Sequence, residues 1–378
     1  MIKWHNLAPA FLFLSVALLQ TSSLQAQFTC TGSICDYFPG GISQELNSTL
    51  GKLENDYLQE VLKNNTEASF LTNIISSSVG TGKVRRVQFG VSASAAAVKK
   101  DDIIIADNNI ELPKLPNGGI SLNPAINLDF NLGWVLGQKE DSFLRRFSIY
   151  LHGMKFNFNE GDAKGSTQAK NNVTLNGKIE SYGGMIRFQA IEETEFGFGF
   201  LTWNGLNVGA GYHYARQDYA LNYRNDNAQS IKIREVEGKW GGDTIFNYQT
   251  VSKTYNVDVR TGIGLFWILN LVVGGGYSWN EGETYVSLSR NGPIVLQTAG
   301  ISDLNIPREY QQFFNQDNSI SQAGTLGLNA DARGVSRRNI AYGIGGLDID
   351  LFLLKINLEG IYGGKDFYGA NLAVRISF

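Results

Sequence analysis

The side chains that most often carry out catalysis are sparse in this chain. Beyond the N-terminal segment only two histidines remain, His152 and His213. Ser148 would share one face of an extended strand with His152, which is the beginning of a serine–histidine hydrolase site. No third partner stands at a recognisable spacing, and hydrogen bonding inside a barrel is the simpler role for both imidazoles. The sequence therefore predicts that the protein is not an enzyme.

Two patterns that could bind phosphate or metal are incomplete. Residues 80–83 read Gly-Thr-Gly-Lys, but a phosphate loop needs glycine where Ser77 stands and serine or threonine where Val84 stands. The acidic residues within 101–109 do not have the spacing of a calcium loop. We therefore predict no cofactor and no metal site.

The two cysteines, Cys30 and Cys35, stand close together near the start of the chain. In an oxidising compartment the short loop between them can close as a disulfide. The alternative is two free thiols. A metal site is not expected, because neither His152 nor His213 lies near the pair in sequence.

The charges that could line a solute path alternate with apolar residues along extended segments. A net charge of −3 argues against a nucleic-acid partner, which would need a basic face. Both signs occur in the alternating set, so the set fits either structural ion pairs or the selectivity lining of a channel. The candidate lumen-lining residues are Asp129, Lys155, Lys178, Glu180, Arg187, Asp258, Arg260, Asp348, Asp350, Lys355, Glu359 and Arg375.

The first 26 residues resemble a cleavable signal peptide. Lys3 precedes an apolar run from Leu7 to Leu19, and Ala26 ends a polar tail. The apolar run is shorter than the roughly 20 residues that span a bilayer. A lipid anchor on Cys30 is the less favoured alternative, because no small residue precedes it. We expect residues 1–26 to direct export and to be removed.

Residues 27–82 form a leader followed by a helical region. Apolar residues recur every three or four positions from Ile42 to Val61, with Ser43 as a possible N-cap and 64–65 as the end. A second short helix is expected over 66–75. The region is predicted to lie in the lumen of a barrel as a plug, or on its periplasmic side.

From Lys83 to Phe378 the hydrophobic period changes to two, which is typical of strands with one buried face. At His152-Gly153 the alternation of apolar and polar residues shifts by one position, which suggests a bulge. The expected connections alternate in length, with long ones near 99–119, 159–171, 224–249 and 289–338, a brief one at 364–366, and short ones near 138–142, 266–269 and 353. Long loops on one side and short turns on the other are typical of a transmembrane barrel. Residues 191–204 fit either one long turn or a further hairpin with a turn at Asn204-Gly205.

Aromatic residues are expected to form two belts at the membrane interfaces. The predicted turn-end belt is Trp134, Phe143, Phe266, Trp267, Phe352 and Phe378. The predicted loop-end belt is Phe156, Phe158, Tyr182, Tyr212, Tyr214, Tyr277, Trp279, Tyr342, Tyr362 and Tyr368.

The last strand carries a resemblance to a known class. Residues 368–378 alternate apolar and polar side chains and end in Phe378. This resembles the C-terminal assembly signal of bacterial outer-membrane β-barrel proteins. The resemblance implies an outer-membrane location, contact with membrane lipid and recognition by the barrel-assembly machinery.

The predicted fold is therefore all-β: a transmembrane antiparallel up-and-down barrel of about ten strands (eight to fourteen), with a short helical N-terminal region. A plug before a barrel is similar in architecture to fatty-acid-transport barrels. Because a helix is about 10 Å wide, we expect a plug to require at least twelve strands.

The function predicted from these features is porin-like passage or transport of small or amphipathic solutes. The alternative is a surface-exposed adhesion or structural barrel that binds host or cell-surface ligands through its extracellular loops. An unobstructed lumen favours transport, and a filled lumen favours the surface role.

Overall fold

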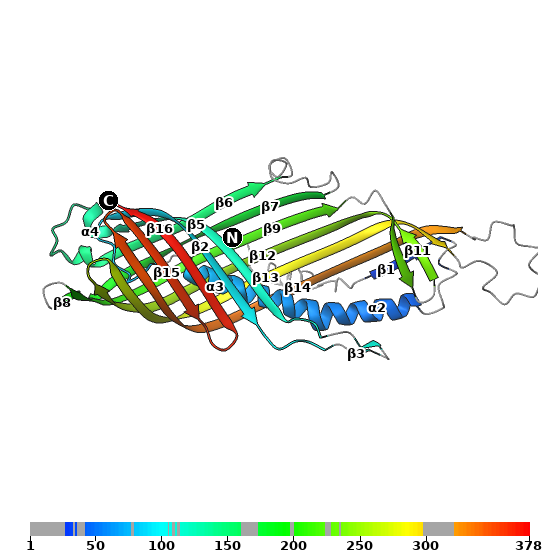
Figure 1. The fold of residues 1–378 in the computed structure, drawn as a ribbon, viewed down its shortest axis with the longest axis horizontal. Coiled ribbons are helices and arrows are strands. Elements are labelled where there is room, and N and C mark those ends of the chain that lie inside the picture. Colours follow the sequence, from blue (N-terminus) through cyan, green and yellow to red (C-terminus); the bar gives the residue numbers. More distant parts are fainter. Residues whose placement is uncertain are drawn as a thin grey trace, which may run out of the picture.

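A computed structural model describes residues 27–32, 35, 42–76, 79–104, 106–107, 110–111, 114–159, 173–196, 200–223, 228–233, 236–297 and 321–378. Within these residues ten antiparallel strands pair in a closed ring (Figure 1). In ring order they are β2 (Val87–Lys99), β5 (Gly118–Asn131), β6 (Phe147–Phe158), β7 (Val173–Ile191), β9 (Leu201–Tyr223), β12 (Asp243–Leu265), β13 (Leu269–Gln297), β14 (Ser321–Leu351), β15 (Leu354–Tyr362) and β16 (Phe367–Ser377). The pairing of β16 with β2 completes the ring, and the predicted ten-strand barrel is confirmed.

The connections at the two ends of the ring differ. At the turn end lie α4 (Leu132–Val135), η4 (Phe143–Arg146), β8 (Thr194–Phe196) and tight turns at 266–268 and 352–353. At the loop end lie β3 (Ala106–Asp107), β4 (Ile110–Glu111), β10 (Gln229–Ile233), β11 (Val236–Trp240) and the short turn at 363–366. Asn204 and Gly205 do not form a hairpin turn. They lie inside β9, where the register with β7 and β12 shifts.

Side chains alternate between an apolar exterior and a polar interior. Val91, Ile186 and Val257 point outward and are exposed, whereas Ser92, Arg187 and Asp258 point inward and are buried. A soluble barrel would have the opposite arrangement, because its apolar face would form the core. The exterior therefore matches the hydrocarbon of a membrane.

Two exposed aromatic belts border this apolar surface. The predicted turn-end residues all lie at the turn end with exposed side chains, from Trp134 at 39% to Phe352 at 106%. The loop-end belt on the outward face consists of Tyr182, Tyr212, Tyr214, Tyr255, Tyr277, Trp279, Tyr362 and Tyr368. From Trp267 to Trp279 the strand climbs about 25–30 Å at ~3.3 Å per residue and a tilt of about 45°. That height matches the hydrocarbon core of a membrane.

Three aromatic assignments from the sequence were wrong. Phe156 and Phe158 point inward, because β6 pairs with β7 without any register shift and the expected bulge at His152-Gly153 does not exist. Tyr342 is 5% exposed and also faces the interior.

The wall of the barrel is uneven in height. β13 has 29 residues and β14 has 31, whereas β15 has 9 and β16 has 11. A membrane crossing needs about 9–11 residues. The residues of β13 beyond Trp279 therefore project about 40 Å past the loop-end belt at ~3.3 Å per residue and a 45° tilt. We call this projecting part of β7, β9, β12, β13 and β14 the tall wall.

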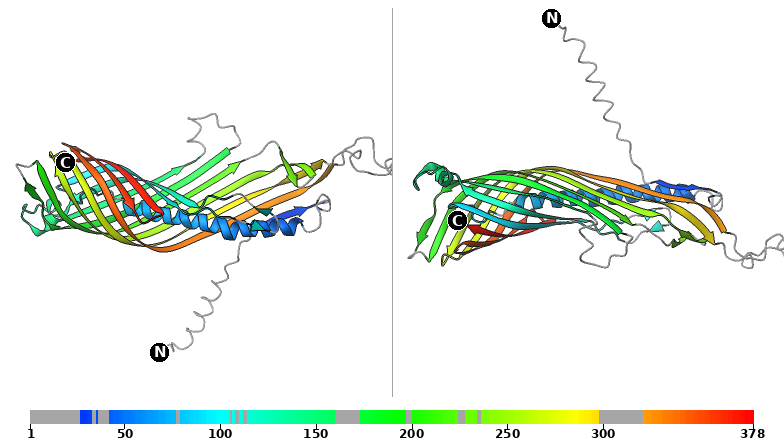
Figure 2. Two further views of the ribbon diagram at one scale, coloured as in Figure 1. Left: turned by 60° about the horizontal axis from the view of Figure 1, so that its bottom comes forward. Right: turned by 90° about the horizontal axis from the view of Figure 1, so that it is seen from above.

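A continuous helix enters the ring from the loop end (Figures 1 and 2). It consists of α2 (Ile42–Lys52), the π-helical η3 (Leu53–Leu58) and α3 (Gln59–Ile75). The break expected at 64–65 does not occur, because Asn64 and Asn65 bond to the barrel instead of ending the helix. Over the described residues no helix is both long and apolar enough to cross a membrane.

The expectation that a plug needs at least twelve strands was wrong, for two reasons. Inward glycines let backbones touch: a Cβ on Gly119 would lie 2.2 Å from Asn64 C, and one on Gly334 would lie 2.2 Å from Lys63 N. In addition, β5 and β6 pair only over 126–131 and 148–153. Beyond that seam, Asn65 Oδ1 accepts from Ile120 N at 2.9 Å, so α3 replaces β6 as the neighbour of β5.

The N-terminal strand β1 (Gln27–Thr31) lies outside the ring, at the loop end. It pairs with residues 325–329 of β14, and Asn47 of α2 accepts from Phe28 N at 2.6 Å. Cys30 and Cys35 are joined in a disulfide. The segment is thereby fixed to the tall wall on the side of the long loops.

Candidate functional site: the helix-filled lumen

The helix α3 is buried around its whole circumference in the middle of the ring. Phe70, Leu71, Ile74 and Ile75 are at most 1% exposed. They pack in one cluster with inward apolar side chains of β2, β14, β15 and β16, which are Ala96, Val98, Ile340, Tyr342, Ile344, Ile361 and Phe367. One face of α3 is therefore held by an ordinary hydrophobic core, which contributes roughly 25 cal/mol per Å² of apolar surface buried.

The opposite faces of α3 are held by small hydroxyl and amide side chains. Thr66 Oγ1 lies 2.7 Å from Thr284 Oγ1, and Ser69 Oγ lies 2.5 Å from Ser252 Oγ. Thr72 Oγ1 lies 3.1 Å from Ser121 Oγ on the other side of the ring. These short side chains allow the helix and the wall to approach closely while each polar group finds a partner.

An ion pair between a buried glutamate and a partly exposed arginine adds to this interface. Glu67 is 1% exposed, and its Oε2 lies 3.1 Å from Arg338 Nη1. Ser336 Oγ donates to Glu67 Oε1 at 3.0 Å. The sequence did not indicate this pair, because a helical glutamate usually faces solvent. Only the placement of α3 inside the ring reveals its role.

Below the helix, towards the turn end, the lumen contains a network of buried charges. Arg260 lies between two carboxylates, with Nε 3.0 Å from Asp258 Oδ2 and Nη1 2.8 Å from Glu359 Oε1. Arg187 also pairs with Asp258. All four side chains are at most 1% exposed. Removing one member of such a network leaves an uncompensated buried charge.

Three further ion pairs complete the charged layer. Lys355 Nζ lies 3.3 Å from Asp348 Oδ2 and 3.8 Å from Asp350 Oδ1. Arg375 Nε lies 2.8 Å from Asp129 Oδ2. The layer is composed of paired opposite charges, which is how a narrow barrel fills its interior.

The segment after α3 binds to this layer through its backbone. Gly80 N donates to Glu359 Oε1 at 2.5 Å, and Thr81 N donates to Asp348 Oδ2 at 3.1 Å. Arg260 Nη1 donates to Gly80 O at 3.2 Å. Gly80 has φ +59°, and a Cβ there would lie 2.2 Å from Asp348 Oδ2. The Gly-Thr-Gly pattern therefore serves to bind carboxylates of the wall, which a side chain at position 80 would prevent.

Nine of the predicted lumen residues point into the lumen and three do not. The nine are Asp129, Arg187, Asp258, Arg260, Asp348, Asp350, Lys355, Glu359 and Arg375. Lys155, Lys178 and Glu180 instead point outward on the tall wall. Lys155 follows the buried His152 by an odd number of residues, and Glu180 precedes the buried Ser181. The placement of these three was wrong. Lys155 was misplaced because the assumed bulge in β6 reversed its inferred face. Lys178 and Glu180 were misplaced because the outward face of β7 carries charges where the strand extends beyond the membrane.

The two histidines lie next to each other inside the ring. His152 Nε2 is 2.8 Å from His213 Nδ1, and His213 Nε2 is 3.1 Å from Asn256 Oδ1. Ser148 Oγ accepts from Val84 N at 3.4 Å and does not contact His152 in the described chain. Among the described residues no group of three or more histidine, cysteine, aspartate or glutamate side chains could hold a metal ion.

Glu192 and Glu193 have a structural role at the turn end. Lys83 Nζ lies 2.6 Å from Glu193 Oε2, and Arg146 pairs with Glu192. They border a vestibule of about 900 Å³ beneath the charged layer. These contacts tie the start of β2 to the turns after β5 and β7.

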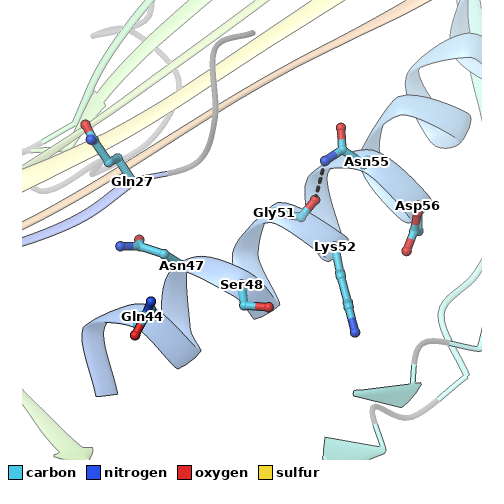
Figure 3. Close-up of a pocket in the computed structure, with 8 residues that line it drawn as sticks. All are labelled: Gln27, Gln44, Asn47, Ser48, Gly51, Lys52, Asn55 and Asp56. Atoms are coloured by element: carbon cyan, nitrogen blue, oxygen red, sulfur yellow. Dashed lines mark hydrogen bonds between the residues drawn. The ribbon is translucent and has the colours of Figure 1, made fainter. Parts of the chain in front are cut away.

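A second hollow lies at the loop end between α2 and β1 (Figure 3). It has a volume of about 500 Å³ and is lined by Gln27, Gln44, Asn47, Ser48, Gly51, Lys52, Asn55 and Asp56. The lining is polar throughout, and Asn55 Nδ2 donates to Gly51 O at 2.7 Å. This polar face of α2 therefore lies outside the lumen, on the same side as the long loops.

Several solved barrels resemble the chain at low identity. The translocator domain of the autotransporter NalP from Neisseria meningitidis is 9% identical with a TM-score of 0.34, and the match covers 84% of this chain and 99% of that one. A Pseudomonas aeruginosa FadL homologue is 9% identical with a TM-score of 0.25, covering 86% and 97%. CarO of Acinetobacter baumannii is 13% identical with a TM-score of 0.21, covering 63% and 96%. The barrel architecture follows from the strand pairing of the chain itself.

The family of the chain follows from its sequence. No curated protein matches it. The family described as Lsa36-like matches residues 23–378, which is nearly the whole chain and includes the helix, the charged layer and the ring. The closed ring, the apolar exterior and the two aromatic belts are those of a bacterial outer-membrane β-barrel. The chain is therefore an outer-membrane β-barrel that belongs to the Lsa36-like family.

Proposed function

We propose that this protein is a closed outer-membrane barrel that works at the cell surface by binding ligands through its loop end. The observation that carries the proposal is α3, which fills the lumen and bonds to the wall on several sides. A pore for free diffusion needs an aqueous lumen, whereas this lumen contains a helix above a layer of paired charges.

The tall wall supports a role outside the membrane. Strands of 29 and 31 residues are far longer than the ~9–11 residues of a membrane crossing. In outer-membrane barrels short turns face the periplasm and longer loops face outside. On that rule the tall wall, β1 and α2 project into the medium and form an ordered surface on which recognition loops are mounted.

Two steps of biogenesis belong to the same proposal. Residues 1–26 direct export and are removed, so that the mature chain begins near Gln27. Phe378 and the strand before it are read by the barrel-assembly machinery. The apolar exterior then contacts membrane lipid.

The test is single-channel conductance of the refolded mature chain in a planar bilayer. The intact barrel is expected to insert without conductance steps. A variant lacking 42–75 is expected to conduct, provided that heat-modifiable migration on gels shows a folded barrel. Regular conductance steps from the intact chain would contradict the closed-barrel proposal.

One observation favours a second function, gated passage of small or amphipathic solutes. On the β5, β6 and β7 side of the lumen, buried polar atoms of Asn127, Tyr150, His152 and Ser181 find no hydrogen-bond partner within the described chain. Unpartnered buried polar groups favour a wetted channel. Conductance of the intact chain that appears only after a voltage step or after addition of a solute would support this function instead.

A further inference from the structure

The outward face of the tall wall contains a hollow that neither the lumen nor the loops explain. It has a volume of about 620 Å³ and lies on β7, β9, β12 and β13. Two adjacent rows of residues form it: Asn176, Ala220 and Asn247 pair across three strands, and Asp218, Gln249 and Tyr285 do so in the next row. The small side chain of Ala220 between longer neighbours creates the depression.

Three amide side chains around this hollow have no hydrogen-bond partner in the described part of the chain. Asn176, Asn247 and Gln249 make no side-chain hydrogen bond within the described residues, and each amide offers two donors and an acceptor. Asp218 is fixed by Arg216, whose Nε lies 2.8 Å from its Oδ2. A free, mixed set of donors and acceptors is complementary to a ligand with many hydroxyl groups.

An aromatic ring borders the same hollow. Tyr285 is half-buried, and its hydroxyl donates to Asp331 Oδ1 at 2.9 Å, which fixes the orientation of the ring. An aromatic face offers an apolar surface on which the C–H face of a sugar can lie. Amides, a fixed carboxylate–guanidinium pair and an oriented tyrosine together match the chemistry of a carbohydrate, and the volume is within the ~300–1,000 Å³ of small-molecule sites.

The height of the hollow above the aromatic belt bears on which carbohydrate could reach it. Tyr182 and Tyr214, in the loop-end belt, lie four residues from Lys178 and Asp218 along β7 and β9. Four residues of a tilted strand raise the hollow about 10 Å above the belt. The hollow faces sideways over the membrane, where the sugars of an outer-leaflet glycolipid would lie. Lys155 and Lys178 on the same face supply cations for phosphates on those sugars.

We propose that this hollow is a binding site for the sugar headgroup of an outer-leaflet glycolipid. The proposal rests on the proposed orientation, with the loop end outside the cell, and does not depend on whether the lumen conducts. The glycolipid would fix the tall wall at a defined height over the membrane.

The experiment measures binding of purified rough-type lipopolysaccharide, which carries lipid A and core sugars, to the full mature barrel in detergent. Ala220→Leu fills the hollow without removing any polar group, and Asn247→Ala removes one amide. Asn339→Ala is the control, since Asn339 is an exposed amide on β14 outside the hollow. Heat-modifiable migration on gels verifies folding of each variant.

We expect Ala220→Leu to weaken binding at least tenfold, Asn247→Ala to weaken it several-fold, and Asn339→Ala to leave it unchanged. Lipid A without core sugars should bind more weakly to the wild type and be insensitive to Ala220→Leu. Equal binding of lipopolysaccharide by the wild type and Ala220→Leu would overturn the proposal. Binding of free core oligosaccharide as tightly as the intact glycolipid would overturn the membrane as the source of the ligand.

Discussion

The charged side chains of the barrel contribute differently to its stability, because some are buried and others are exposed. Arg260→Met leaves Asp258 and Glu359 buried without one of their cations, and we expect it to lower the free energy of unfolding by about 3–5 kcal/mol. Lys178→Met is the matched control, because its pair with Glu180 lies on the outer surface, where an ion pair contributes about 0–1 kcal/mol. Urea unfolding of the refolded barrels compares the two. Equal losses would contradict the assignment of Arg260 to a buried network.

Gly119 determines whether the helix fits the ring. A methyl group there would lie 2.2 Å from Asn64 C, so Gly119→Ala should displace α3 and expose residues 60–75 to protease. Gly345→Ala is the control, since a Cβ at that position has no atom within 4 Å. Limited proteolysis of both variants measures the effect. Protection of α3 in Gly119→Ala equal to that in the control would show that the helix does not touch this strand.

At the scale of elements, the helix is also fixed where it leaves the lumen. Lys100 Nζ donates to Glu60 Oε1 at 2.7 Å, and this hydrogen bond, more than the charge attraction of Lys100, lowers the pKa of Glu60 from its ordinary 4.5. A lowered pKa in the folded state means that the pair stabilises the fold above the pKa of the unfolded chain. The stabilisation by the Lys100–Glu60 pair is lost as the pH falls through the lowered pKa of Glu60.

The Lys100–Glu60 pair predicts how the stability of the barrel depends on pH. Lys100→Met should reduce the stability of the barrel by at most about 1 kcal/mol at pH 7, because Glu60 is one-third exposed. The difference in free energy of unfolding between wild type and variant should be constant from pH 6 to 8 and should shrink as the pH falls below 4.5. Unfolding by urea at a series of pH values measures it. A difference that grows towards acid would contradict the pairing.

Particular elements show how far the sequence predicted the fold. The alternation of apolar and polar residues from Val87 to Phe378 was sufficient to predict the strands. Each strand has one face towards lipid and one towards the lumen, so its sequence shows a period of two. The helix could not be placed, because α3 is polar on the faces that meet Ser252 and Thr284, and that pattern also fits a helix in water. Lys178 was assigned to the wrong face, because a strand of the tall wall carries charged side chains on its outward face beyond the membrane.

At the scale of the whole molecule, the path of the chain has a consequence for the cell surface. β1 pairs with residues 325–329 of β14, so residues 27–31 and the loop end of the barrel are on one side of the membrane. We expect an impermeant reductant followed by an impermeant maleimide to label Cys30 and Cys35 on intact cells. A cysteine at Ser142, at the turn end, should be labelled only after permeabilisation. Labelling of the cysteine at position 142 on intact cells, with Cys30 and Cys35 labelled only after permeabilisation, would contradict this topology.

The position of α3 inside the lumen can be tested by a single cross-link. Ser69 of α3 and Ser252 of β12 have hydroxyl oxygens 2.5 Å apart. In a chain with Cys30 and Cys35 changed to serine, Ser69→Cys with Ser252→Cys should form a disulfide during assembly in the cell, seen as a mobility shift that reductant reverses. Ser69→Cys with Ser336→Cys is the control, since Ser336 bonds to Glu67 on another face of the helix. A disulfide in the first pair only is the predicted result, and no disulfide in a folded, membrane-inserted first pair would contradict the filled lumen.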